Sequence, residues 1–174
     1  RLSKLLAKNC EKNDCRMIRF AGGEKSNAIP TEAVAELLVD ASAEAELSEL
    51  FARAQKTVTE ADAAAEIIFE RFAYTGPVFD MYATKQICRL IATVRNGVVS
   101  RYERLDLVKT SLNTGIVRAE NGHFELHSMV RSSDDREMKA LTDEVCAMIE
   151  SAGFFYQKDG EYPSWAYEEC SALR

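Results

Sequence analysis

The first part of the chain alternates between strand-like and helix-like hydrophobic patterns. Residues 17–21 and 32–41 each predict a strand, and in the second run the charged and apolar side chains favour opposite faces. From Ser42, a residue type common at helix N-caps, the spacing becomes helical. The apolar stripe of this helix contains Leu47, Leu50, Phe51, Ala54 and Val58. We therefore expect two strands separated by a turn at Gly22-Gly23, then a helix that lies on a sheet.

The rest of the chain repeats the alternation of strands and helices. The predicted elements are a strand at 66–74, a helix at 80–96, strands at 108–120 and 123–132, a helix between 133 and 153, and a last strand. Gly76-Pro77 stops the first of these elements, and Gly97 and Gly153 end the two helices. Because hairpins outnumber parallel crossovers, we expect an α+β fold. It would be an antiparallel sheet with helices packed on one face and ferredoxin-like β-α-β elements.

The Asn121-Gly122 pair is the strongest short-range hairpin signal in the chain. A two-residue loop there pairs Glu120 with His123, and the count then places Leu112 opposite Arg131. The predicted core face carries Val117, Ala119, Phe124, Leu126 and Val130. The other face, left for water or a partner, carries Thr114, Arg118, Glu125, His127 and Arg131.

Composition and charge narrow the classes of function. The 174 residues carry a net charge of −6, with Lys and Arg scattered along the chain, which disfavours nucleic acid and anionic membranes as partners. No apolar run approaches the roughly 20 residues of a membrane-spanning helix, and no signal peptide opens the chain. We expect a soluble, cytoplasmic, single domain at 1–174. Residues 1–10 look like a helix already under way, which suggests a piece of a longer protein.

Few residues in the chain could carry out catalysis or bind a metal. The cysteines are odd in number and include no C-x-x-C pair, which is typical of free thiols in a reducing compartment: Cys10, Cys15, Cys88, Cys146 and Cys170. Cys10 and Cys15 have no second ligand pair downstream, so a zinc knuckle is not expected. His123 and His127 stand roughly 13 Å apart on one strand and cannot share an ion. We expect no catalytic residue, metal or cofactor in this chain.

Three segments of the sequence, taken in order, resemble a known family. They are RMIRFAGGEKSNAIPTEA (16–33), TSLNTGIVRAENGHFELHSMVRSS (110–133) and GEYPSWA (160–166). They resemble the aminoacyl-histidine dipeptidases, the bacterial Xaa-His dipeptidases of the metallopeptidase family that also holds aminoacylases and carnosinases. Ser26 and Thr31 stand where that family has arginine, and Ser164 stands where it has glycine. The resemblance covers nearly the whole chain.

The resemblance implies a lid or dimerisation domain, inserted into a catalytic domain that holds two zinc ions. The whole enzyme would hydrolyse aminoacyl-histidine or β-alanyl-histidine dipeptides with a metal-activated water and a carboxylate base. In this chain, Asn27 would point at the bound dipeptide and Arg131 would hold its carboxylate through a bidentate pair. His127 shares the face of Arg131 and is a weaker substrate-binding candidate. The implied partners are the chain's own catalytic domain, a dipeptide and a second copy of the chain.

Each candidate residue also has a simpler interpretation. Asn27 would be a turn residue beside glycine and proline. Arg131 would be the salt-bridge partner of a neighbouring strand, and His127 a half-exposed polar side chain. The alternative function is a free-standing α+β binding or oligomerisation module with no catalytic parent. Metal-ligand motifs upstream of Arg1 or downstream of Arg174 would separate the two hypotheses.

Overall fold

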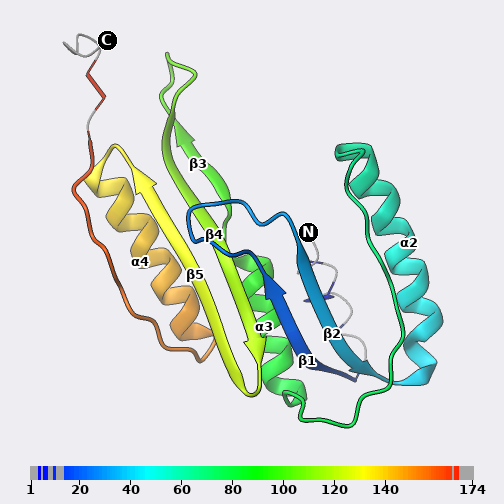
Figure 1. Ribbon diagram of the computed structural model, residues 1–174. Coiled ribbons are helices and arrows are strands. Elements are labelled where there is room, and N and C mark those ends of the chain that lie inside the picture. The colour runs from blue at the N-terminus through cyan, green and yellow to red at the C-terminus, as the bar shows by residue number, and fades with distance from the viewer. Residues whose placement is uncertain (1–3, 5, 8–9, 11–13, 166, 169–174) are drawn as a thin grey trace. The chain divides into compact units, whose positions relative to one another are not determined.

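The computed structural model describes residues 4, 6–7, 10, 14–165 and 167–168 (Figure 1). Its strands are β1 (Cys15–Gly22), β2 (Ala33–Val39), β3 (Gly97–Arg101), β4 (Val108–Glu120) and β5 (His123–Ser132). Its helices are the 3₁₀ turn η1 (Ala41–Ala43), α2 (Glu44–Ala61), α3 (Met81–Thr93) and α4 (Asp135–Ser151). The strands form one antiparallel sheet in the order β2-β1-β4-β3, with β5 paired to β4. The expected α+β class is confirmed.

The chain divides into two compact units. The first contains Arg1–Ala21, Ala33–Ala92 and Arg118–Phe124. The second contains Gly22–Glu32, Thr93–Val117 and Glu125–Arg174. Asn27, His127 and Arg131, the three candidate binding residues, all belong to the second unit.

Of the helix expected over residues 1–10, the described residues Lys4, Leu6, Ala7 and Cys10 are helical, and the others lie outside the described residues.

In the first unit, the core is built around β1. Met17 and Phe20 of this strand are buried, and α3 supplies the buried Thr84. The Thr84 hydroxyl accepts a hydrogen bond from the Met17 N–H at 2.9 Å, and the Phe79 N–H donates to the Met17 carbonyl at 2.8 Å. A side chain and a loop thus satisfy both backbone groups of Met17, which explains why a polar residue is tolerated in this core.

Helix α2 confirms the stripe predicted from the sequence but not its cap. Leu47 and Ala54 of the stripe are buried. The N-cap is Ala43, which makes no side-chain hydrogen bond, so the prediction of Ser42 as the cap is wrong. The 3₁₀ turn η1 leads directly into the helix, and the first turn of α2 therefore begins one residue later than a Ser42 cap would place it.

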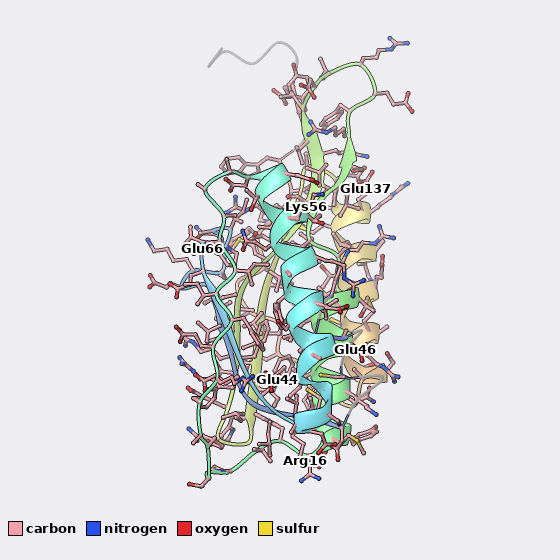
Figure 2. The ribbon with its side chains drawn as sticks, turned by 90° about the vertical axis from the view of Figure 1, so that its right-hand side faces the viewer. Arg16, Glu44, Glu46, Lys56, Glu66 and Glu137 are labelled. Carbon is pink, nitrogen blue, oxygen red and sulfur yellow. The ribbon has the colours of Figure 1, made fainter. Side chains whose placement is uncertain are left out.

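The strand predicted at 66–74 is not formed. This segment runs beside α2 as irregular chain (Figures 1 and 2). Two contacts hold it against the helix: Phe69 stacks on Phe51 with ring centroids 5.1 Å apart, and Arg71 pairs with Glu44. Local alternation predicted a strand, and packing of side chains against a helix overrode it.

The hairpin at Asn121-Gly122, whose turn belongs to the first unit, forms as predicted between β4 and β5. Both turn residues have positive φ, 52° for Asn121 and 78° for Gly122, as a type I′ turn requires. Strand β3, which the sequence pattern did not reveal, pairs antiparallel with β4 and places Gly97 beside Leu112. The helix expected to run to residue 96 ends at Thr93, which leaves room for this strand.

The face predicted for the first part of β4 is wrong. Leu112 is fully buried, although it was placed opposite Arg131 on the outer face. Thr114 likewise lies on the other face, because its hydroxyl hydrogen-bonds the Ser128 hydroxyl at 3.0 Å. Buried positions are even-numbered up to Leu112 and odd-numbered from Gly115 onward. We infer that one extra residue in β4 shifts the alternation between these positions.

Helix α4 begins and ends as its sequence predicts. The Asp134 carboxylate accepts hydrogen bonds from the backbone N–H groups of Arg136 and Glu137, at 2.9 and 3.2 Å. Gly153, with φ of 83°, follows the last turn. The final strand expected after this helix is absent from residues 154–165, which are irregular. No helix in the described part of the chain is long and apolar enough to cross a membrane.

Candidate functional site

The loop at Gly22–Glu32 joins β1 to β2 (Figure 1), and hydrogen bonds from the middle of β4 hold it in place. The side-chain amide of Asn113 donates to the carbonyls of Ser26 and Ala28, at 2.7 and 3.0 Å. Gly115 lies so close to the loop that a Cβ there would overlap the Lys25 carbonyl. The loop is therefore anchored through its backbone and is more than a surface turn.

Asn27 lies between the two carbonyls that Asn113 holds. Its own side chain is exposed and makes no hydrogen bond to any described residue. A further turn bond, from the Ala28 N–H to the Lys25 carbonyl at 3.2 Å, fixes the backbone around it. The loop thus presents a free amide, with one donor and one acceptor group, from a fixed position.

Arg131 is exposed near the end of β5. Its Nε donates to the Met129 sulfur at 3.4 Å, and it forms no ion pair with a carboxylate in the described part of the chain. The structure therefore does not support the simpler interpretation of Arg131 as a salt-bridge partner. Its guanidinium keeps most of its N–H donors available for a ligand such as a carboxylate.

His127, the third candidate, faces solvent on the same strand. Its Nε2 lies 3.6 Å from a carboxylate oxygen of Glu125, and both side chains are more than half exposed. Such an exposed pair is weak and depends on protonation of the imidazole. No hydrogen bond or ion pair among the described residues joins Asn27, His127 and Arg131 to one another. The three are assigned to one unit but not to one contact network.

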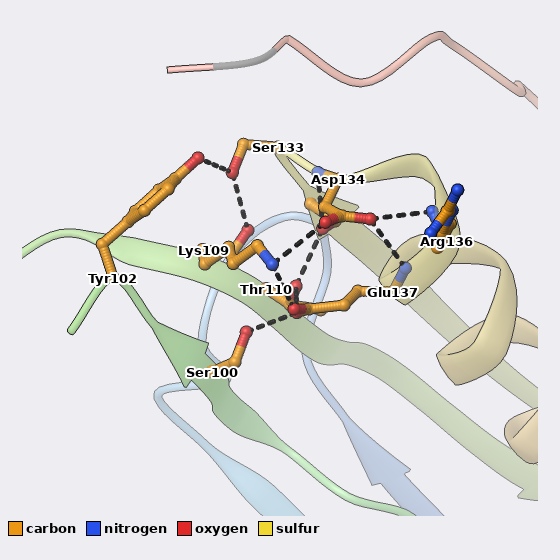
Figure 3. Close-up of polar contacts among 9 residues, drawn as sticks. Ser100, Tyr102, Lys109, Thr110, Ser133, Asp134, Arg136 and Glu137 are labelled. Atoms are coloured by element: carbon orange, nitrogen blue, oxygen red, sulfur yellow. Dashed lines mark hydrogen bonds and ion pairs between the residues drawn. The ribbon is translucent and has the colours of Figure 1, made fainter. Parts of the chain in front are cut away.

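A polar cluster fixes the chain immediately after Arg131 (Figure 3). At its centre the Glu137 carboxylate, in the first turn of α4, accepts hydrogen bonds from Lys109 and Thr110 of β4 and from Ser100 of β3, the last at 2.6 Å. We call Ser100, Lys109, Thr110, Ser132, Asp134 and Glu137 the α4 cluster. It ties two strands and the end of a third to the start of one helix.

The α4 cluster also reaches back to β5. The Ser132 hydroxyl lies 2.8 Å from the Thr110 hydroxyl and accepts a hydrogen bond from the Asp134 N–H at 3.0 Å. Beside it, the Tyr102 hydroxyl lies 2.7 Å from that of Ser133. Because Ser132 directly follows Arg131 in the chain, the cluster defines where the strand carrying this arginine ends.

Charge pairing sets the ionisation of the α4 cluster. The hydrogen bond from Lys109, helped by those from Ser100 and Thr110, lowers the pKa of Glu137 to about 2. The same pair, with a contribution from Asp134, raises the pKa of Lys109 to about 12. Hydrogen bonding to Lys109 also lowers the pKa of Asp134. All three groups are therefore charged over the whole physiological pH range.

Sequence reasoning missed both supports of the candidate site. Asn113 and Gly115 lie within the predicted strand at 108–120, and glycine inside a strand is a signal for close backbone approach. The helix between 133 and 153 was predicted, but the partners of Glu137 come from residues 27 to 37 positions away. Within the described residues, no group of three or more His, Cys, Asp and Glu side chains could hold a metal ion.

The chain is similar in sequence and in fold to parts of two dipeptidases. No protein-family model matches the chain. It is 28% identical over 169 residues to the cytosol non-specific dipeptidase of Escherichia coli (strain K12). This alignment covers 94% of this chain and 35% of that relative. Its fold matches a crystal structure of the aminoacylhistidine dipeptidase from Vibrio alginolyticus with a TM-score of 0.90, at 24% identity, covering 99% of this chain and 36% of that one.

These findings confirm the resemblance drawn from the three motifs. The chain spans about a third of the length of the dipeptidases it matches. It is similar, over nearly its entire length, to one domain-sized part of such an enzyme.

Proposed function

We propose that this chain is the lid domain of a larger, cytoplasmic, zinc-dependent dipeptidase that hydrolyses aminoacyl-histidine or β-alanyl-histidine dipeptides. The lid positions the dipeptide and supports dimerisation, and alone it does not catalyse. Neither nucleic acid nor a membrane is a partner. The similarity to a third of two dipeptidases, one of them cytosolic by name, supports this proposal.

The observation that carries the proposal is the anchored loop around Asn27. Asn113 binds the carbonyls on both sides of Asn27, and the side-chain amide of Asn27 has no hydrogen-bond partner among the described residues. An exposed, preorganised amide is suited to hydrogen-bond a polar ligand such as a peptide. Arg131, with its unpaired guanidinium, would supply the charge that holds the peptide carboxylate.

The metal chemistry of such an enzyme would come from outside this chain. The described residues contain no set of His, Cys, Asp and Glu that fits a zinc ion. Two zinc ions would therefore belong to the catalytic domain, where a metal lowers the pKa of bound water and polarises a carbonyl. The residues of this chain would bind and orient the substrate and exclude water from it.

The test is the effect of Asn27→Ala in the full-length enzyme. Loss of one neutral hydrogen bond, worth about 0.5 to 1.5 kcal/mol, should lower kcat/KM for an aminoacyl-histidine dipeptide about two- to tenfold. Glu24→Ala is the control in the same loop, because Glu24 is exposed and forms no ion pair or side-chain hydrogen bond with the described residues. Equal kcat/KM values for both variants and the parent would remove Asn27 from the site.

The alternative, a free-standing binding or oligomerisation module, is distinguished by the gene. A reading frame that encodes metal-ligand motifs on both sides of residues 1–174 supports the lid, and a frame without them supports the module. The isolated chain provides a second comparison. As a lid it should hydrolyse no carnosine-like dipeptide and retain no stoichiometric zinc after dialysis, and turnover that a chelator abolishes would contradict the proposal.

A further inference from the structure

Three buried thiols meet in the first compact unit. Cys10 belongs to the N-terminal helical stretch, Cys15 begins β1, and Cys88 lies in α3. Their exposed fractions are 0% for Cys10, 0% for Cys15 and 2% for Cys88. The sulfur atoms of Cys10 and Cys15 share a hydrogen bond at 2.9 Å. No other part of the proposed function uses these residues.

The surroundings of Cys10 favour its thiolate. Hydrogen bonds from the Cys15 and Cys88 thiols lower the pKa of Cys10 to about 4, against the opposing effect of burial. The same hydrogen bonds, together with burial, raise the pKa of Cys15 and of Cys88. Lys85 adds a smaller attraction for a negative charge at Cys10. Of the three thiols, Cys10 is therefore the one at which the neighbouring hydrogen bonds favour a negative charge.

We propose that Cys10 and Cys15 are a peroxide-sensitive pair that forms a reversible disulfide, with Cys10 as the attacking sulfur and Cys88 as its supporting donor. The sulfur atoms must approach by only about 0.9 Å to reach the length of a disulfide bond. Because both sulfurs are fully buried, a small oxidant such as hydrogen peroxide suits the site better than a bulky disulfide. The described residues offer no competing metal site at these thiols.

Disulfide formation would proceed in two chemical steps. The Cys10 thiolate attacks one oxygen of hydrogen peroxide, the O–O bond breaks, and hydroxide leaves while Cys10 becomes a sulfenic acid. The Cys15 sulfur then attacks the Cys10 sulfur, the S–O bond breaks, and the departing hydroxyl takes the Cys15 proton as water. Hydroxide takes up the proton that Cys10 had released. Overall, two thiols and one peroxide give one disulfide and two waters, with two electrons passed from sulfur to oxygen.

The test is peroxide treatment of the folded chain, followed by alkylation of the remaining thiols and peptide mapping. We expect a peptide linked through Cys10 and Cys15, with two hydrogens lost, and recovery of both thiols after addition of dithiothreitol. The Cys146→Ser/Cys170→Ser variant is the matched control and should form the same link to the same extent. Oxidation of Cys146 or Cys170 before Cys10 in the folded protein would overturn the proposal.

Variants of the three thiols separate their roles. Cys15→Ser should stop at the sulfenic acid on Cys10, which dimedone traps, whereas Cys10→Ser should give neither sulfenic acid nor disulfide. Cys88→Ala should slow disulfide formation at least tenfold at pH 6, where the Cys10 thiolate depends on its donors. Circular dichroism melts identify any variant that fails to fold. If one does, the peptide map of the folded Cys146→Ser/Cys170→Ser variant, which retains the other three cysteines, still tests the Cys10–Cys15 link. A dominant Cys10–Cys88 link would refute the assignment of Cys15.

Discussion

At the scale of single residues, Arg131 offers the sharpest separation between binding and packing. Its one hydrogen bond to the described residues is with the Met129 sulfur and the side chain is exposed, so Arg131→Ala should change the free energy of unfolding by no more than about 0.5 kcal/mol. If the guanidinium holds the substrate carboxylate, the same substitution in the full-length enzyme should lower kcat/KM more than tenfold. Arg131→Lys should recover only part of the loss, because an ammonium group cannot form the bidentate pair.

The control for Arg131 is Arg104→Ala. Arg104 is exposed and forms no ion pair with any described residue, so its truncation removes the same charge from a surface outside the candidate site. Thermal melts beside the kinetics distinguish lost binding from lost folding. Normal kcat/KM in a stable Arg131→Ala enzyme would leave this arginine without a role in substrate binding. His127→Ala, on the same strand, should have a smaller effect than Arg131→Ala, since its ring already pairs with Glu125.

At the scale of secondary-structure elements, the α4 cluster links stability to pH. The pKa of Glu137 is lowered in the folded state, so its stabilising contribution is present above its ordinary value of 4.5 and is lost as the pH falls toward 2. The pKa of Lys109 is raised, so its contribution is present below 10.5 and is lost as the pH rises through about 12. Stability from this pair should therefore be constant between roughly pH 5 and pH 10.

Glu137→Gln tests this dependence. At pH 7 the variant should melt below the parent, and the difference between the two should shrink as the pH falls from 5 to 2, because Glu137 then becomes neutral in the parent as well. Glu161→Gln is the matched control, since Glu161 is exposed and forms no ion pair among the described residues. A constant difference in melting temperature from pH 7 to pH 2 would show that the charge of Glu137 does not matter.

The elements that the sequence predicted correctly are those with local signals. Asn121-Gly122 specifies its own turn, and Asp134 and Gly153 mark the ends of α4 within a few residues of chain. The elements it predicted wrongly depend on distant partners. Residues 66–74 were predicted as a strand but pack against α2. Leu112 lies on the core face and not on the predicted outer face, which we attribute to the extra residue inferred in β4, and no local pattern revealed that residue.

The candidate site shows the same difference between features with local sequence signals and features that depend on distant partners. Asn27, His127 and Arg131 were named from motifs, and the sequence alone also predicted that Arg131 faces away from the core. It could not reveal that Asn113, some 85 residues along the chain, holds the backbone around Asn27. Long-range hydrogen bonds of this kind require the register between distant strands, and the alternation of one strand does not contain it.

At the scale of the whole molecule, the sheet order places β2 at an edge. Leu38 of this strand is exposed, and an exposed apolar edge strand favours pairing with another chain. We expect light scattering to show a dimer of the isolated chain at high protein concentration, and Leu38→Lys to shift it to monomer without lowering the melting temperature. Val98→Lys, at an exposed site on β3, is the control and should leave the dimer intact.

A monomer at every accessible concentration would contradict this expectation. The chain would then close over a substrate without contributing to a dimer through this edge. A dimer that resists Leu38→Lys but yields to Val98→Lys would instead move the contact to the second compact unit.

One nitrogen atom makes both side-chain hydrogen bonds from β4 to the Asn27 loop. The Nδ2 of Asn113 donates to two carbonyls, and deamidation would replace it with oxygen in a side chain of the same shape. A carboxylate can only accept hydrogen bonds, so it would face two carbonyl oxygens and repel them. The hairpin and its helix would remain folded, because their backbone bonds do not involve this amide. Chemical ageing at one strand residue would thus release the loop and leave a protein that still looks intact.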